Sequence, residues 1–418
     1  SKQWSDELQI NYSSAKLQAT VGAIWFKAKD ETGAPTGQQN TLGFPTIIPQ
    51  TGFIPLGNAS RSFNESTSIA AYAQLEYKIL PTLELVAGAR ITHDKKDYTL
   101  LYDVRSSAGV TTPRTPIISP TYTKSKPSFM VGLNWKPNDD ILVYGKFSTS
   151  FVSGGSTVGI DYDPETAKSF EVGIKADWLD HKLRTNLALF HVDYNHYQAS
   201  QGTRLPAAAT IARTIFTSLY TTKTPAEITE LVSAASLFII DQGTLRAQGF
   251  ELEVTAAPTR GLTLGTGVGY TDAKFPYIVP LVLSANGGVF NITQRPKWTA
   301  TLWGVYETQP LFGDATLQFR MDGNYRSNTP IYANKAASLY ADGSNATAIS
   351  DINGYMLVNG RVALRHINLA GANAELAVWG KNITNRRERA YGLSIGAPAT
   401  TSYYVAARTF GVDLSINF

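Results

Sequence analysis

The stretch YYVAARTFGVDLSINF, residues 403–418, contains two chemically different faces. Successive side chains of a β-strand point to opposite sides, so every second residue shares a face. One face of this stretch is entirely apolar, and it consists of Phe410, Val412, Leu414, Ile416 and Phe418. Such a strand suits a transmembrane β-barrel, in which one face meets lipid and the other meets a wet lumen. Taken by itself, the stretch also fits the last strand of a soluble β-sandwich.

Composition narrows the class of protein. Apolar residues make up 43% of the 418 residues, and the longest nearly apolar run, around residues 231–240, is too short to span a bilayer as a helix. Charged residues are 17%, below the roughly 25% of soluble domains. The chain has 21 Tyr and 7 Trp, which suits aromatic girdles at membrane interfaces. These values favour a β-barrel over a helical membrane protein.

Cysteine content and charge exclude several kinds of site. The absence of cysteine rules out disulfides, Cys-ligated zinc and thiol catalysis. A formal net charge of +4 shows no basic patch for nucleic acid, so we expect no nucleic-acid partner. No shift in composition divides the chain, and we expect residues 1–418 to form one barrel unit.

Two-sided alternation recurs along the whole chain and predicts 15 strands. Short turns alternate strictly with long loops, as in bacterial outer-membrane barrels with short periplasmic turns and long extracellular loops. We therefore predict an all-β, antiparallel transmembrane barrel that crosses the bacterial outer membrane many times. One strand, Lys182 to Gln198, changes parity between Leu189 and Phe190, which predicts a β-bulge there.

The longest loop, about Ser200 to Ser236, contains one predicted helix. Thr224 can cap it, Pro225 occupies its first position, and Glu227 has the spacing of a capping box. This helix, Pro225–Ala235, could cover a ligand, contact an extracellular partner, or only stiffen the loop.

The strand count predicts a truncated barrel. The last strand ends in the periplasm, so the first strand, Trp4 to Tyr12, starts outside. A complete barrel has an even number of strands with both ends in the periplasm. We therefore expect an N-terminal portion to be lacking, with seven strands absent from a parent of about 22.

Several motifs together resemble the TonB-dependent outer-membrane receptor family, in its C-terminal barrel region. They span the chain: residues 5–10 (SDELQI), 147–155 (FSTSFVSGG), 163–175 (DPETAKSFEVGIK), 248–253 (QGFELE), 269–273 (GYTDA), 295–298 (RPKW) and 380–385 (GKNITN). Phe418 matches the aromatic terminus that serves in this family as a signal for the barrel-assembly machinery. The family's plug domain, TonB box and early strands are absent from the sequence.

The resemblance implies active transport of a scarce small ligand, with an iron-siderophore complex as the default. It also implies energy from the TonB complex, delivered through a plug that this chain lacks, and it implies no enzyme activity. A passive porin-like or structural barrel is the alternative. A plug-type sequence upstream in the gene would favour the receptor, and a signal peptide directly before Ser1 would favour a standalone barrel.

Charged residues on the polar strand faces are the candidate site. They would point into the lumen as a transport path or as plug contacts, and they are Arg90, Glu171, Lys175, Glu251, Glu253, Arg320, Arg361 and Arg365. For any one of them, a cross-strand pair in a wet lumen is the commoner role.

Other patterns carry no chemistry, and we expect no catalytic group, metal or cofactor. Glu251 and Glu253 share a face, but glycosidase chemistry needs a sugar held between two carboxylates. His191 and His196 are five apart on one strand and face opposite sides. The glycines at 265, 267 and 269 precede no helix, so they are not a dinucleotide fingerprint, and the segment at Gly154 lacks the lysine of a phosphate loop.

Overall fold

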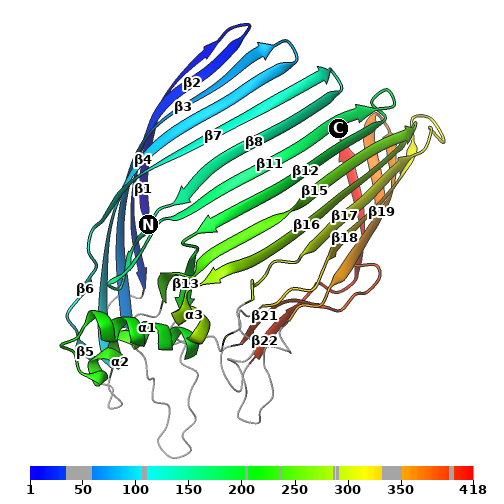
Figure 1. Ribbon diagram of the computed structural model, residues 1–418. Coiled ribbons are helices and arrows are strands. Elements are labelled where there is room, and N and C mark those ends of the chain that lie inside the picture. The colour runs from blue at the N-terminus through cyan, green and yellow to red at the C-terminus, as the bar shows by residue number, and fades with distance from the viewer. Residues whose placement is uncertain are drawn as a thin grey trace, which may run out of the picture.

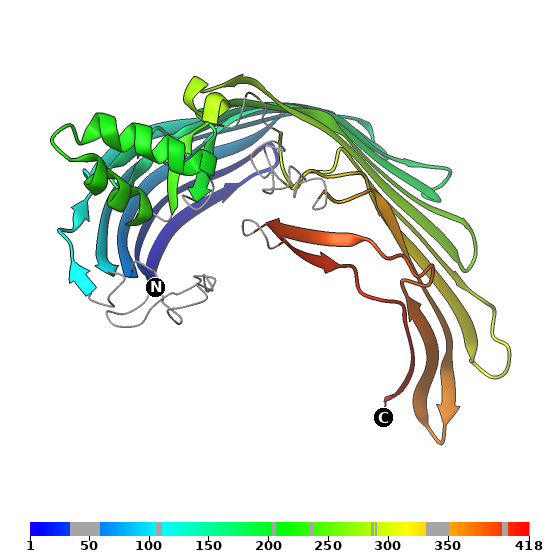
Figure 2. The same ribbon diagram turned by 90° about the horizontal axis from the view of Figure 1, so that it is seen from below.

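The structure is a computed structural model that describes residues 1–33, 59–105, 111–202, 206–234, 237–285, 288, 291–331, 351–394 and 400–417. Over these residues, 17 strands form one sheet that curves into an arc (Figures 1 and 2). Fifteen of these strands have nine residues or more, which confirms the predicted number for the described part of the chain. The short ones are β5 (Thr111–Pro113) and β6 (Ile117–Ile118).

The long strands are β1 (Lys2–Ser13), β2 (Leu17–Gly33), β3 (Ala59–Leu80), β4 (Leu83–Arg105), β7 (Tyr122–Asn138), β8 (Ile141–Val152), β11 (Glu165–Trp178), β12 (Leu183–Asn195), β15 (Gly243–Thr259), β16 (Leu262–Ile278), β17 (Trp298–Glu307), β18 (Thr316–Arg326), β19 (Tyr355–Leu369), β20 (Ala372–Lys381) and β23 (Thr409–Asn417).

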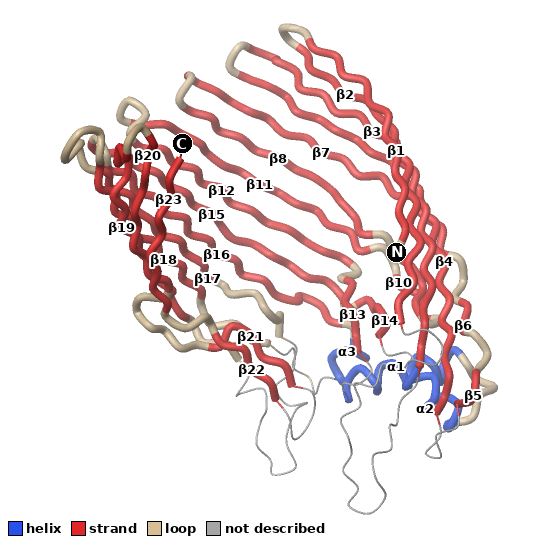
Figure 3. The backbone as a smooth tube through the Cα atoms, turned by 180° about the vertical axis from the view of Figure 1, so that it is seen from behind, coloured by secondary structure: helices blue, strands red, loops and turns tan. Residues whose placement is uncertain are grey.

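Each long strand pairs antiparallel with the next long strand in the chain, from β1–β2 to β20–β23. Short turns lie at one end of the sheet and the long connections lie at the other (Figure 3). The predicted alternation is therefore confirmed. Within the described ranges, β1 and β23 are the two edges of the arc, and each pairs on one side only.

The two faces of the sheet differ as the alternation requires. Apolar side chains of one parity are open on the outside, for example Leu8 at 71% exposure, Phe410 at 66% and Leu414 at 65%. Soluble proteins rarely expose so large an apolar surface. We assign this parity to lipid and the polar parity to the lumen, because a barrel in a bilayer requires that arrangement.

The bulge predicted between Leu189 and Phe190 is wrong. β12 keeps an unbroken register with β11 and with β15. Phe190 and Val192 lie on the lumen side, whereas the outward positions beyond Leu189 are taken by His191 and Asp193. The side chains of β12 keep alternating regularly between the two faces. Only the chemical character of each face changes, because this end of the strand leaves the lipid and its outward face meets water.

Large lumen-facing aromatic rings lie flat on glycines of the paired strand. A Cβ added at each of these glycines would lie within 2.6 Å of the ring: Gly22 beneath Tyr72, Gly173 beneath Tyr144, Gly265 beneath Trp303 and Gly411 beneath Trp379. Glycine is needed here because only a missing side chain lets the ring cross the neighbouring strand. Trp303 of the neighbouring strand thus accounts for Gly265, one of the three glycines of β16 that the sequence analysis found not to be a dinucleotide fingerprint.

A small cap of loop structure stands at the end of the sheet where the long connections gather (Figure 1). It contains α1 (Pro206–Leu219), α2 (Pro225–Ala234), α3 (Pro280–Ala285) and the hairpins β9–β10 (Gly155–Thr157, Ile160–Tyr162) and β13–β14 (Gln198–Gly202, Leu237–Asp241). Its core includes Val158, Ile211, Phe216, Phe238 and Val282, all fully buried. Leu100 and Tyr102 of β4 join this core, so the cap packs on the lumen parity of the wall.

Only α2 was predicted from the sequence, and α1 and α3 were missed. Pro206 at the start and the spacing of Ile211, Ile215 and Leu219 are the signals that point to α1. A further hairpin, β21–β22 (Arg389–Ser394, Thr400–Tyr404), lies on the concave side of the arc (Figure 2). Among the described residues, no helix has the length and hydropathy to cross a membrane.

Candidate functional site

Glu171 and Glu253 take part in cross-strand contacts on the lumen wall. The Glu171 carboxylate lies 3.1 Å from Lys146 Nζ and accepts a hydrogen bond of 2.8 Å from the Tyr144 hydroxyl. The side-chain amide of Asn186 donates to Glu253 over 3.3 Å. Both residues therefore form cross-strand contacts, which is the commoner role of a charged residue in a wet lumen.

Glu251 differs from these two carboxylates. It is exposed on β15, and among the described residues it has no hydrogen-bond or ion-pair partner. Its cross-strand neighbours are Ala188 of β12 and Gly269 of β16, and Gly249 precedes it on the same face. A Cβ added at Gly267 would meet nothing within 4 Å. Glu251 therefore has an unpaired carboxylate beside the small residue Ala188 and the open position at Gly267, and we call this part of the wall the bare patch (Ala188, Glu251 and Gly267). The adjacent glycines are covered, Gly249 by the Phe190 ring and Gly269 by the Thr299 hydroxyl.

Lys175 lies in a polar pocket near the short-turn end of the sheet. The pocket has a volume of about 320 Å³ and is also lined by Asp177, Arg184 and Asn186. Arg184 donates two hydrogen bonds to Asp177, of 2.7 and 2.8 Å, and thereby satisfies that carboxylate. Lys175 has no ion-pair partner within the described ranges, so its ammonium is available to an anionic group in the lumen.

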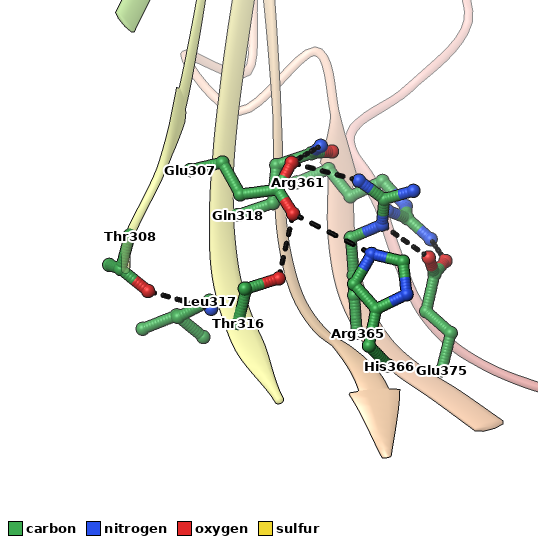
Figure 4. A network of polar contacts seen from close by, with 9 residues as sticks. All are labelled: Glu307, Thr308, Thr316, Leu317, Gln318, Arg361, Arg365, His366 and Glu375. Atoms are coloured by element: carbon green, nitrogen blue, oxygen red, sulfur yellow. Dashed lines mark hydrogen bonds and ion pairs between the residues drawn. The ribbon is translucent and has the colours of Figure 1, made fainter. Parts of the chain in front are cut away.

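Arg361 and Arg365 belong to a network that joins four strands, β17 to β20 (Figure 4). Arg365 bridges two carboxylates, with Nη1 3.0 Å from Glu307 and Nε 3.0 Å from Glu375. Arg361 forms a second ion pair with Glu375. Glu307 also accepts hydrogen bonds from Thr316 and Gln318.

This network surrounds an irregularity in β19. The register between β19 and β20 shifts between Leu364 and Ile367, and His366 has a φ of 57°. The shift lies beside Arg365, so we infer that the ion pairs hold the bulge in place. The sequence analysis missed Glu307 and Glu375, although both fall on the lumen parity of their strands and could have been found by extending the alternation.

The remaining predicted residues are spread along the wall. Arg90 donates to Thr92 over 2.9 Å and lies 6.0 Å above the Tyr72 ring. Arg320 is exposed, 3.9 Å from Asp322. Phe418 lies outside the described residues. The structure thus brings Arg361 and Arg365 together and places Arg320 directly opposite Arg361 in the register of β18 with β19. Lys175 and Glu253 are the two cross-strand neighbours of Asn186.

His191 of β12 and His196, just beyond the end of that strand, form two separate pairs. His191 lies 3.1 Å from Asp193, and His196 lies 2.8 Å from Asp241 of β14. His191 is on the outward face, and His196 is in the loop region after β12, with a φ of 53°. The two rings therefore belong to different surroundings.

The capping box predicted for α2 is present. The Thr224 N–H and hydroxyl both donate to Glu227 over 2.8 Å, and the Glu227 N–H donates to Thr224 Oγ1 over 3.3 Å. These bonds favour the charged carboxylate, so the pKa of Glu227 lies below its usual value. Arg213 of α1 donates to Thr229 and Arg114 pairs with Glu230, which ties α2 to its surroundings.

Comparison with known proteins gives a consistent assignment. A family model described as "TonB dependent receptor-like, beta-barrel" matches residues 1–383. The ferric-pyoverdine M114 receptor PbuA of Pseudomonas sp. (strain M114) is 24% identical over 415 residues, which are 96% of this chain and 43% of that protein. A probable TonB-dependent siderophore receptor, PiuA of Acinetobacter baumannii, is 24% identical over 343 residues, 74% of this chain and 38% of that protein. The chain thus spans about two fifths of the length of these curated relatives.

Solved structures share the fold. The ferric yersiniabactin uptake receptor FyuA from Yersinia pestis aligns with a TM-score of 0.67 and 14% identity, over 100% of this chain and 54% of that chain. The ferripyoverdine receptor of the Pseudomonas aeruginosa outer membrane aligns with a TM-score of 0.62 and 15% identity, over 99% of this chain and 47% of that chain. With the matched family model, the curved wall and the two-faced strands, the chain belongs to the TonB-dependent receptor family and is part of an outer-membrane β-barrel.

Proposed function

We propose that this chain forms the wall of a TonB-dependent receptor that takes up a ferric siderophore or a similar chelate. One named relative is a ferric-pyoverdine receptor and the other a probable TonB-dependent siderophore receptor, which supports this class of ligand. The other members of the proposed assembly are the TonB complex, which supplies energy through a plug domain, and the barrel-assembly machinery, which inserts the strands.

The bare patch around Glu251 is the observation that carries the proposal. A free carboxylate next to Ala188 and near the open position at Gly267 leaves room for a closely packed partner inside the lumen. A basic side chain of a plug would satisfy Glu251 and would pack against Gly267. A passive pore would gain nothing from this surface, because a smooth wall and one free charge neither narrow a channel nor bind a solute tightly.

The cap is the proposed ligand-facing part of the wall. It packs on the lumen parity of β4, at the end of the sheet where the long connections gather (Figure 1). Its three helices and two hairpins share one core, which would hold the surrounding loops in a fixed arrangement around a bound chelate.

Uptake measurements test the function. The native gene that contains this chain is deleted and returned either as wild type or with Glu251→Gln, and radioactive iron uptake from ferric pyoverdine and other ferric siderophores is compared. We expect uptake to depend on the gene and on TonB, and to fall at least several-fold in Glu251→Gln, since a charge pair that loses one partner weakens its contact substantially. Glu76→Gln, which neutralises another lumen-facing carboxylate on β3, is the matched control and should transport normally.

Uptake that persists without TonB would instead support the porin-like alternative. Uptake that is unchanged when the gene is deleted would contradict an iron-chelate receptor. A third outcome is that wild-type uptake depends on the gene and on TonB, but Glu251→Gln transports normally. This would support the receptor function and contradict only the proposed contact between Glu251 and the plug.

A further inference from the structure

We propose, on the basis of the function proposed above, that the β21–β22 hairpin selects the ligand by its charge. Two arginines and three exposed tyrosine rings of the hairpin bind an anionic iron chelate that carries aryl rings. The hairpin lies on the concave side of the arc, at the end of the sheet where the long connections gather (Figures 1 and 2). It therefore stands where a solute from outside enters the lumen.

The positive charge of the whole chain is concentrated in the segment that carries this hairpin. Residues 381–410 contain five basic residues and a single acidic one, so the formal net charge of this segment equals the +4 of all 418 residues. The rest of the chain is neutral in sum. Charge of one sign at the mouth of a lumen raises the local concentration of solutes of the opposite sign, which here are anions.

Three of the five basic residues already have a contact. Lys381 and Arg408 each lie over an aromatic ring, at 5.4 and 5.7 Å from the ring centre. Arg386 forms an ion pair of 2.9 Å with Glu388, the acidic residue of the segment. These contacts leave two arginines for a ligand.

Arg387 and Arg389 are these two arginines. Neither has an ion-pair partner within the described ranges, and Arg387 is exposed. Nη1 of Arg389 is buried and has no hydrogen-bond partner in the part of the chain that the structure describes. A buried donor that stays unpaired costs free energy, and an oxygen atom of a bound anion would remove this cost. The two guanidinium groups therefore favour a ligand with anionic oxygen atoms.

Three tyrosines of the hairpin accompany Arg389. Tyr404 is its cross-strand neighbour, and Tyr391 pairs with Tyr403. The rings of Tyr391 and Tyr403 lie 6.3 Å apart. All three side chains are exposed, at 39% for Tyr391, 60% for Tyr403 and 64% for Tyr404. Open phenol rings offer flat apolar faces, so a ligand with aryl rings and anionic oxygens would use both groups, whereas a carboxylate chelate would use the arginines alone.

The base of the hairpin is held in place by Asn382, which is 4% exposed. Its side-chain amide donates to the backbone carbonyls of Arg386 and Ala406, over 2.9 Å each, and its Oδ1 accepts from the Arg386 N–H over 2.8 Å. The Val405 N–H also donates to the Glu388 carbonyl over 2.9 Å. The two sides of the base are thereby tied together before a ligand arrives, which lowers the entropy that binding costs.

Chelate binding to the native protein that contains this chain tests the proposal, with the protein purified in detergent and tryptophan fluorescence as the readout. The probes are a ferric tris-catecholate (anionic, with rings), ferric citrate (anionic, without rings) and a neutral ferric trihydroxamate. We expect the wild type to prefer the tris-catecholate.

Arg387→Gln combined with Arg389→Gln should weaken binding of the tris-catecholate at least about tenfold, since a hydrogen bond to a charged group contributes about that factor. Binding of the trihydroxamate should not change. The matched control removes two cations from the short-turn end, Lys182→Gln with Arg260→Gln, and should bind all three probes as wild type.

A second pair of variants tests the rings. Tyr391→Leu combined with Tyr403→Leu should weaken binding of the tris-catecholate about fivefold and leave ferric citrate unchanged, since an aromatic pair contributes about that factor. Tyr12→Leu combined with Tyr77→Leu changes two tyrosines of the outward face near the short turns, and it should bind as wild type.

Each part of the proposal has an outcome that would overturn it. Equal binding of anionic and neutral chelates by the wild type, or full binding by the double arginine variant, would overturn the selection by charge. Ferric citrate bound as tightly as the tris-catecholate, or normal binding by the double tyrosine variant, would overturn the role of the rings. A wild type that binds none of the probes would overturn the ligand class, and TonB-dependent uptake of another ferric siderophore would show that the proposed function survives.

Discussion

Gly265 and Gly267 are two positions apart on the same face of β16, yet their surroundings differ. A Cβ at residue 265 would lie 2.2 Å from the Trp303 ring, whereas a Cβ at residue 267 would meet nothing within 4 Å. We predict that Gly265→Ala destabilises the protein by about 1–3 kcal/mol, because the ring must leave its place. Gly267→Ala, the matched control, should change stability by at most about 0.5 kcal/mol. Urea unfolding followed by tryptophan fluorescence measures both, and equal effects would refute the explanation.

Arg365 offers a second test at a single position. Its replacement by Met removes contacts to Glu307 and Glu375 and leaves two carboxylates close to the β19 bulge. We expect a loss of about 2 kcal/mol, the range for hydrogen bonds to charged groups. Arg320→Met removes an arginine of the same face that is 57% exposed and lies 3.9 Å from its nearest carboxylate, so it should cost little. Denaturant midpoints compare the two, and an Arg320 effect as large as that of Arg365 would contradict the role of the network.

The elements show where sequence patterns succeed. The capping box of α2 was predictable because its three residues are local in sequence, and the alternation of β23 was predictable because one face meets lipid along its whole length. β12 was misinterpreted because its end leaves the lipid. Outward residues there, such as His191, are polar, and the inward residue Phe190 lies over Gly249 of β15. The apolar stripe of α1 was present in the sequence. Only α2 was predicted as a helix, because it also had the spacing of a capping box.

The capping box of α2 predicts how the stability of the cap depends on pH. The pKa of Glu227 is lowered by hydrogen bonds from Thr224, and the unfolded value is near 4.3. The bonds therefore stabilise α2 fully above the unfolded pKa, and this contribution is lost as the pH falls through the lower, folded pKa. Limited proteolysis of the cap should be measured from a pH above the unfolded pKa to a pH below the folded pKa. It should show faster cleavage at the acidic end of this pH range. The cap of the Glu227→Gln variant should be cleaved at the same rate at every pH in this range. Wild-type cleavage that does not depend on pH would contradict the stabilising role of Glu227.

At the scale of the whole molecule, the sequence was enough for the fold class and for the order of strands. Alternation and loop asymmetry are imposed by the bilayer on every strand, so fifteen independent signals agree. The grouping of the site residues was not predictable, because Arg361 and Glu375 meet only through the register of β19 with β20. Nor could the sequence show that Glu251 is free while Glu171 is paired, since that depends on which residues lie opposite them.

The rings that cover the glycines also determine how wide the lumen is. Trp303, Trp379, Tyr72 and Tyr144 are large groups on the inner face, but each lies against the wall over a glycine of the adjacent strand. The clear cross-section is therefore set by the backbone and not by these side chains. A steric size limit for a passing solute would therefore be imposed by the other groups inside the lumen, such as the cap that packs on the inner face of β4, and not by these rings.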